Sequence, residues 1–149
     1  MSNTLDWNNF DDTGFYLLEK MQLNESDPYQ LHFSYNKFIK LFDKHRQTDP
    51  ENEKRLMQIC KLDIELFPKF REAWFTQNPT YNFLPRVPSF QKLIQIYERN
   101  LQIEEAVDIC KLAIHYNLDD GTKGGYAGRL QKLEKKLSRS KRTPQTVGK

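Results

Sequence analysis

Apolar residues recur three and four positions apart along most of the chain, which is the spacing of one face of an α-helix. The densest stripe runs from Tyr29 to His45, and another runs from Ile103 to Tyr116. The same spacing predicts helices over residues 14–23, 29–45, 50–67, 71–77, 89–100, 103–116 and 126–139. We therefore expect an all-α protein.

Prolines mark the predicted ends of several helices. Pro28 and Pro50 suit the first turn of a helix, where no amide N–H is needed, and Asp49 before Pro50 is a favourable N-cap. Pro68 is expected to end the helix over 50–67, because its ring clashes with the preceding turn.

Two further segments are predicted to lack regular helix. Three prolines between residues 78 and 88 predict an extended connection. Gly121 is available for a left-handed conformation at the stop after the helix over 103–116. Residues 140–149 have Val147 as their single large apolar residue, and we expect a disordered basic tail there.

A short string occurs twice. Ile59–Ile64 and Ile109–Ile114 match at five of six positions and lie fifty residues apart. Both copies fall in the second helix of a predicted pair. Such self-similarity indicates a repeated helical hairpin.

The second copy lies in a recognisable context. Its large and small residues are Phe90, Leu93, Ile94, Tyr97, Ala106, Cys110 and Ala113. Their spacing resembles the tetratricopeptide (TPR) pattern, in which small residues let two antiparallel helices approach closely. Ile94, Cys110 and Leu118 stand where the pattern has a glycine, an aromatic residue and a proline.

The resemblance implies a degenerate TPR-like stack of antiparallel helix pairs over residues 29–139, with a C-terminal capping helix. Residues 1–28 would be a lead-in with a short helix, and residues 140–149 the tail. The helix over 14–23 and the last helix would then cap the two ends of the stack.

The resemblance also implies a function. TPR-like proteins are non-catalytic adaptors or scaffolds, in which the first helices of the pairs line a groove that receives a peptide or helix from a protein partner. By the inner-face spacing of the family, the groove residues here are Gln91, Gln95, Glu98 and Arg99.

The charge of the chain raises an alternative. Net charge is +3, but residues 129–149 carry eight basic side chains against one acid, or +7, which leaves −4 on residues 1–128. Clustered Lys and Arg release counterions from phosphates, as expected of a nucleic-acid-associated accessory protein. An ordinary solvated helix face has the same composition, and the aromatic residues of a stacking platform are missing, so we favour the adaptor.

The glycine-rich string from Gly121 to Arg129 is the most unusual in the chain. A glycine-rich loop entering a helix could hold a phosphate or carboxylate on free backbone N–H groups, although the Walker spacing is missing. We favour a tight interhelix turn in which Arg129 pairs with Asp119 or Asp120. The candidate contacts for an anion or nucleic acid are Lys123, Arg129, Lys132, Lys135, Lys136 and Arg139.

The sequence carries no recognisable motif for catalysis, a metal or another cofactor. Cys60 and Cys110 lie in apolar stripes and are expected to be buried thiols. His32, His45 and His115 are far apart and lack a metal-ligand spacing. We therefore expect a protein that is not an enzyme.

Two further expectations concern the compartment. The first ten residues lack the basic and apolar stretches of a secretory signal. No apolar run reaches the roughly 18 residues that a membrane span needs. The default expectation is a cytoplasmic protein without membrane contact.

Overall fold

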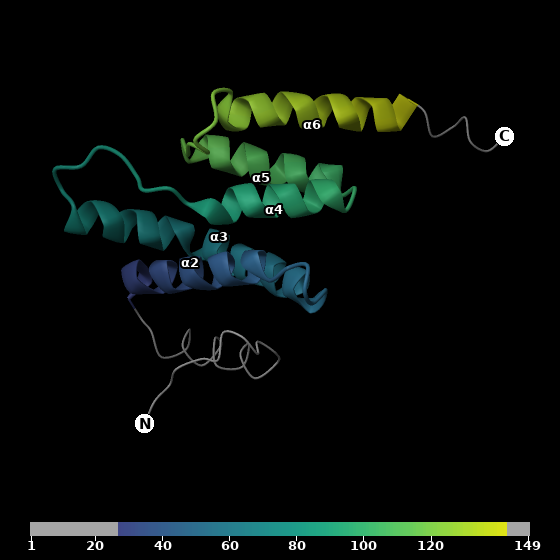
Figure 1. The fold of residues 1–149 in the computed structure, drawn as a ribbon. Coiled ribbons are helices and arrows are strands. Elements are labelled where there is room, and N and C mark those ends of the chain that lie inside the picture. Colours follow the sequence, from purple (N-terminus) through teal and green to yellow (C-terminus); the bar gives the residue numbers. More distant parts are fainter. Residues whose placement is uncertain (1–26, 143–149) are drawn as a thin grey trace. The chain divides into compact units, whose positions relative to one another are not determined.

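The computed structural model describes residues 27–142, and every regular element in that range is an α-helix (Figure 1). The helices are α2 (Pro28–Lys44), α3 (Glu51–Gln77), α4 (Pro88–Arg99), α5 (Ile103–His115) and α6 (Gly125–Arg142). The predicted all-α fold is confirmed. The helix predicted over residues 14–23 lies outside the described residues.

The chain divides into two compact units, residues 1–82 and residues 83–149. Unit 1 contains the hairpin of α2 and α3, and unit 2 contains α4, α5 and α6. The sequence predicted a single helical domain over residues 29–139 instead. Each unit is considered by itself below.

In unit 1, each helix begins shortly after an aspartate whose side chain accepts a hydrogen bond from a backbone amide at the helix start. The amide of Tyr29 donates to Asp27 Oδ1 at 3.0 Å, with Pro28 in the first turn of α2. The amide of Glu51 donates to Asp49 Oδ1, also at 3.0 Å, so Asp49 satisfies the first amide of α3, while Pro50 occupies the N-cap position itself. These side chains satisfy amides that have no partner inside the helix.

The prediction that Pro68 ends a helix is wrong. Helix α3 runs through Pro68 without a break, so the short helix predicted over 71–77 is the second half of α3. An interior proline costs about 3 kcal/mol. Beyond it, however, Phe70 and Trp74 continue the buried stripe of Phe67, and each such burial contributes about 1.5–3 kcal/mol. Tertiary burial therefore outweighs the local preference.

A polar pair lies inside the α2–α3 hairpin, among its aromatic side chains. The Nδ1–H of His32 donates to Asp63 Oδ1 at 2.7 Å, and both side chains are fully buried. The ring of His32 stacks on Phe70 with centroids 3.8 Å apart. The side-chain amide of Asn36 donates to His32 Nε2 at 3.3 Å. Because both ring nitrogens have partners, His32 is held as a structural residue of the core.

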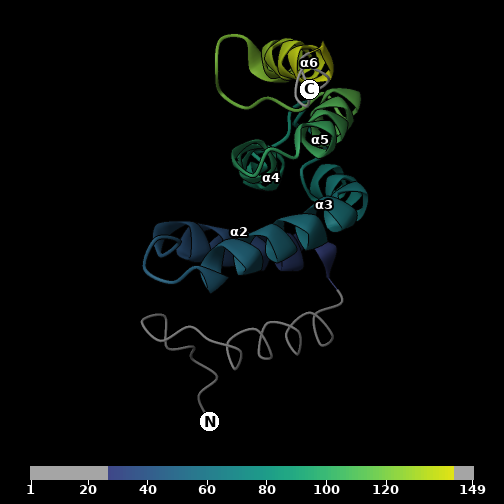
Figure 2. The same cartoon turned by 90° about the vertical axis from the view of Figure 1, so that its right-hand side faces the viewer.

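Unit 2 begins with the α4–α5 hairpin. The residues predicted to form its helix crossing are buried: Phe90, Leu93, Tyr97, Ala106 and Ala113. Helix α5 packs against both α4 and α6, as the two views show (Figures 1 and 2). The small side chains on α5 leave room for its neighbour at the crossing.

Both helices of this hairpin end in a left-handed residue. Leu101 has φ +61° and Asn117 has φ +59°. The next amide bonds back across each turn, from Gln102 to the Tyr97 carbonyl at 2.8 Å and from Leu118 to the Ala113 carbonyl at 3.0 Å. These are the bonds of a Schellman motif. Asn117 thus stops α5, and Gly121 adopts the left-handed conformation that the sequence predicts for it, with φ +81°, in the turn that follows.

The last helix is longer than its sequence predicts. Residues 140–142 belong to α6, so the predicted tail is wrong for these three residues, and residues 143–149 lie outside the described range. No helix among residues 27–142 combines the length and apolar character of a membrane span.

Candidate functional site

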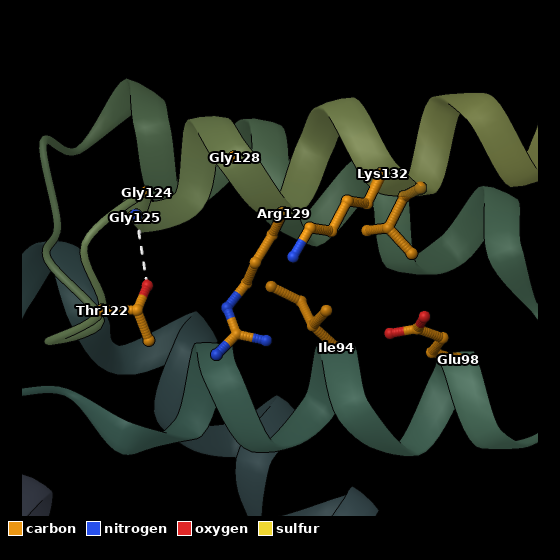
Figure 3. Close-up of a pocket in the computed structure, with 9 residues that line it drawn as sticks. Ile94, Glu98, Thr122, Gly124, Gly125, Gly128, Arg129 and Lys132 are labelled. Atoms are coloured by element: carbon orange, nitrogen blue, oxygen red, sulfur yellow. Dashed lines mark hydrogen bonds between the residues drawn. The ribbon is translucent and has the colours of Figure 1, made fainter.

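Unit 2 contains a cavity of about 440 Å³ between α4 and α6 (Figure 3). Helix α4, the loop before α6 and the first turns of α6 line it with Ile94, Glu98, Thr122, Gly124, Gly125, Gly128, Arg129, Lys132 and Leu133. Ile94 and Leu133 are buried and form an apolar floor. The remaining lining residues are polar or glycine, so the cavity has an apolar base and a polar mouth.

Three glycines keep the α6 side of the cavity open. A side chain at Gly125 or Gly128 would meet no atom within 4 Å, so nothing fills the space in front of them. Gly125 also has φ +64°, a conformation that suits glycine at the start of α6. The cavity therefore depends on the glycine-rich string that stood out in the sequence.

The charged groups of the mouth come from α6 and α4. Arg129 and Lys132 extend from α6 into the space between the helices (Figure 3). Glu98 of α4 forms an ion pair with Lys136, which holds this carboxylate at the edge. Lys132 is exposed and has no ion-pair partner among residues 27–142. The mouth therefore carries an excess of positive charge.

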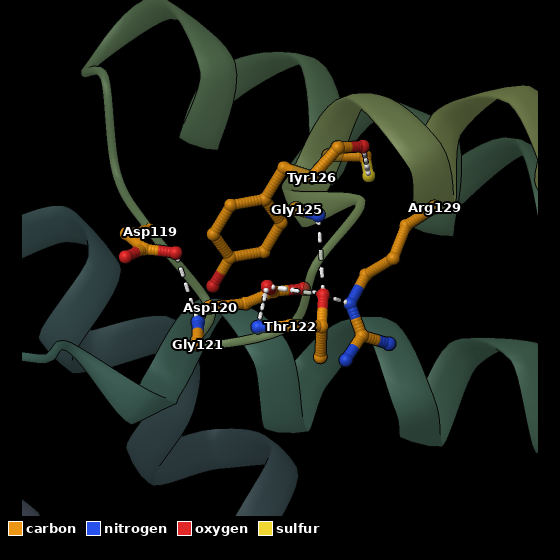
Figure 4. A network of polar contacts seen from close by, with 8 residues as sticks. Asp119, Asp120, Gly121, Thr122, Gly125, Tyr126 and Arg129 are labelled. Carbon is orange, nitrogen blue, oxygen red and sulfur yellow. Dashed lines mark hydrogen bonds and ion pairs between the residues drawn. The ribbon is translucent and has the colours of Figure 1, made fainter.

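Arg129 is fixed by the turn that precedes α6 (Figure 4). Its Nε–H donates to Asp120 Oδ2 at 2.5 Å, as one of the two predicted pairings requires. The hydroxyl of Thr122 donates to Asp120 Oδ1 at 2.6 Å and accepts from the amide of Gly125 at 3.1 Å. The interpretation of this string as a tight interhelix turn is confirmed.

The electrostatics of Asp120 follow from these contacts. Burial works to raise the pKa of Asp120, but hydrogen bonds from Thr122 and Arg129 outweigh it and hold the pKa below its usual range. Asp120 is therefore a carboxylate at neutral pH. It positions the guanidinium of Arg129 with the two terminal amino groups available to a ligand.

The thiol nearest this turn is not a nucleophile. Burial raises the pKa of Cys110 to about 11, and its Sγ–H donates to the Tyr126 carbonyl at 3.3 Å. A nucleophilic cysteine needs the thiolate form near neutral pH. Cys110 and Cys60 are both fully buried, as predicted.

The structure brings together residues that the sequence had placed in two separate sets. Glu98 of the predicted groove lies at the same cavity as Arg129 and Lys132 of the predicted anion set. Other predicted residues are not among those lining the cavity: Gln91, Gln95, Arg99, Lys123, Lys135, Lys136 and Arg139. Sequence reasoning missed Ile94, Thr122, Gly128 and Leu133 as site residues. The glycine-rich string was the signal for Thr122 and Gly128, whereas Ile94 and Leu133 lie outside it.

The basic residues of α6 share one side of the helix. At 100° per residue, Arg129, Lys132, Lys135, Lys136 and Arg139 fall within about 120° of arc. Lys132, Lys135, Lys136 and Arg139 are exposed. The opposite arc holds the inward residues Tyr126, Leu130, Leu133 and Leu137. We refer to the four exposed cations as the basic face of α6.

Within the described residues no three His, Cys, Asp or Glu side chains are grouped so that they could hold a metal ion. Comparison of the chain with models of protein families, with curated proteins and with solved structures finds no match. Fold and site thus define an all-α protein with a positively charged cavity in its second unit. The TPR resemblance stays a prediction.

Proposed function

We propose that this protein is a non-catalytic adaptor or scaffold of TPR-like type, and that a protein partner inserts side chains into the α4–α6 cavity. One observation carries the proposal: Arg129 and Lys132 stand at the mouth of a cavity whose floor is Ile94 and Leu133. A cavity of about 440 Å³ falls within the roughly 300–1,000 Å³ typical of ligand pockets.

The lining indicates the chemistry of the partner. Arg129 is held by Asp120, so its terminal amino groups can donate to a carboxylate without reorganising. The apolar floor favours an aliphatic or aromatic side chain next to that carboxylate. The partner segment would therefore combine acidic and apolar residues, as an acidic amphipathic peptide does.

The α4–α5 hairpin supports the TPR-like part of the proposal. Ala106 and Ala113 are fully buried at its crossing, where the TPR pattern has small residues. Phe90, Leu93 and Tyr97 are buried at the spacing of the large residues of that pattern.

A second function, association with nucleic acid, is favoured by the basic face of α6. Four exposed cations on one side of a helix could contact successive phosphates. Binding through all four would give a log–log salt slope of about −3.6 on duplex DNA, at roughly −0.9 per phosphate contact. Binding of a protein partner through the cavity alone involves no phosphate contacts, so it predicts no such salt slope.

A matched pair of charge reversals separates the two functions. Lys132→Glu and Lys135→Glu change the net charge equally and lie on the same helix, but only Lys132 lines the cavity. Each tagged variant is expressed in the native cell and purified with and without nuclease, and co-purifying proteins are quantified.

The proposal expects a protein that resists nuclease, is lost at least tenfold with Lys132→Glu and is retained with Lys135→Glu. The captured protein is then titrated with a peptide of its acidic, apolar segment. Equal weakening by both reversals, together with release by nuclease, would establish the nucleic-acid function instead. Retention of the protein by both variants would show that the cavity is not its binding site.

A further inference from the structure

The side of helix α2 opposite its buried stripe is basic. Lys37, Lys40 and Lys44 are exposed there, with the half-buried Leu41 between them, all within about 100° of arc. A cavity of about 420 Å³ lies against this side, and these four are the described residues that line it. We refer to them as the basic face of α2.

The basic face of α2 has no anionic partner in the described part of the chain. None of the three lysines forms an ion pair with a residue of the range 27–142. Lys40 and Lys44 are four positions apart, the spacing at which like charges repel on a helix surface. A carboxylate beside them would replace that repulsion by attraction.

The sequence supplies a complementary segment directly before α2. Residues 1–26 contain five acidic side chains against Lys20, a formal charge of −4. At helical spacing, Phe15, Leu17, Leu18 and Met21 share one side of the segment. Asp11, four positions before Phe15, falls on that same side, between Leu18 and Phe15. An acidic and apolar segment thus adjoins a basic face that contains a leucine.

Chain geometry sets the register. A helix ending at Leu23 would leave residues 24–27 as the connection to α2, a length common between two antiparallel helices. Asp11 precedes Leu23 by twelve positions, and Lys40 follows Pro28 by twelve. As helices, both stretches are about 18 Å long, so a hairpin brings Asp11 level with Lys40. Asp12 then lies within one turn of Lys37 and Lys40.

We infer that residues 11–23 dock in cis, antiparallel to α2, with the carboxylates of Asp11 and Asp12 on the basic face of α2. A short tether holds such a segment at an effective concentration of order millimolar, which favours the same chain over a second copy. Docking is independent of the α4–α6 cavity, which lies in unit 2.

Zero-length carbodiimide cross-linking of the full chain tests this contact. A carbodiimide joins a carboxylate to an amine only when the two are in contact, and peptide mapping identifies the residues joined. We expect cross-links from Asp11 or Asp12 to Lys37, Lys40 or Lys44 in the monomer fraction. Hydrogen exchange of residues 14–23 is measured on the same samples.

Charge reversals provide the control. Lys40→Glu with Lys44→Glu should accelerate exchange of residues 14–23 at least tenfold. Lys69→Glu with Lys111→Glu makes the same change of charge at exposed positions elsewhere and should leave it unchanged. Restoring attraction by adding Asp11→Lys and Asp12→Lys to the first pair should recover the protection.

Three results would overturn the inference. Cross-links confined to a dimer fraction would assign the face to a second copy of the chain. Exchange that ignores the reversal of Lys40 and Lys44 would show that these lysines do not hold the segment. Failure of the compensating reversals at Asp11 and Asp12 to recover protection would place other carboxylates there.

Discussion

The buried pair of His32 and Asp63 should dominate the stability of unit 1. Asp63→Ala removes the acceptor of a 2.7 Å hydrogen bond and leaves the Nδ1–H of His32 without a partner inside the hairpin. An unsatisfied buried donor costs about 1–3 kcal/mol, and a hydrogen bond to a charged group contributes about 1.5–3 kcal/mol. We expect a loss of about 3 kcal/mol, a large part of the 5–15 kcal/mol typical of a domain.

Urea unfolding measures the effect if the probe lies in the same unit. Trp74 stacks on Tyr29 with ring centroids 6.0 Å apart, so its fluorescence follows the α2–α3 hairpin. The measurement uses a Trp7→Phe background, because Trp7 is the other tryptophan of the chain. Glu65→Ala, at an exposed position of α3, is the control and should change stability by less than about 0.5 kcal/mol.

A double substitution separates the pair from the mere loss of volume. His32→Phe with Asp63→Leu replaces both polar partners by apolar side chains, which is often nearly neutral in a buried site. The double variant should therefore be more stable than Asp63→Ala. The reasoning is refuted if Asp63→Ala costs less than about 1 kcal/mol of unfolding free energy. It is also refuted if the double variant loses as much stability as His32→Phe and Asp63→Leu measured singly and added together.

Three further predictions concern unit 2. Ala106→Leu should destabilise by roughly 1–3 kcal/mol in thermal unfolding, because Ala106 is fully buried at the helix crossing; equal stability would contradict a close crossing. Gly128→Ala should stabilise by roughly 0.5–1 kcal/mol, since a methyl group there meets no atom; a loss of stability would mean that the cavity is filled. For Asp120 the folded pKa is lowered, so its contribution is present above an unfolded pKa near 4 and is lost as pH falls through the folded value. The stability difference from Asp120→Asn should shrink below about pH 4, and a difference that grows would reverse the sign of the shift.

Local sequence patterns predicted most of the helices, because the apolar spacing and the residues near the helix ends mark elements that the folded protein contains. Helix α5 begins at the predicted Ile103, and Asp49 accepts a hydrogen bond from the first amide of α3. The failure at Pro68 has a tertiary cause. The cost of an interior proline is local and visible in the sequence, whereas the burial of Phe70 and Trp74 that offsets it depends on α2.

The candidate site divides in the same way. Arg129 and Asp120 are nine positions apart, on either side of the same turn, so the local sequence could suggest their pairing. His32 and Asp63 are 31 positions apart, and Glu98 and Lys136 are 38 apart. No local sequence pattern indicates which residues so far apart in the chain come into contact. The sequence therefore identified the chemical groups of α6 but not the cavity that some of them share with α4.

Position, rather than the number of charges, is what distinguishes the cations of α6. Arg129 is tied to Asp120 and Lys136 to Glu98, so two of the basic residues are partly neutralised within unit 2. Lys132 lies between these two pairs and has no ion-pair partner in the described residues. Any anion entering the cavity meets Lys132 and the terminal amino groups of Arg129 together. A polyanion along the outside of α6 would contact Lys132 as one of several cations. Lys132 would therefore contribute a larger share of the binding in the cavity than along the outside of the helix.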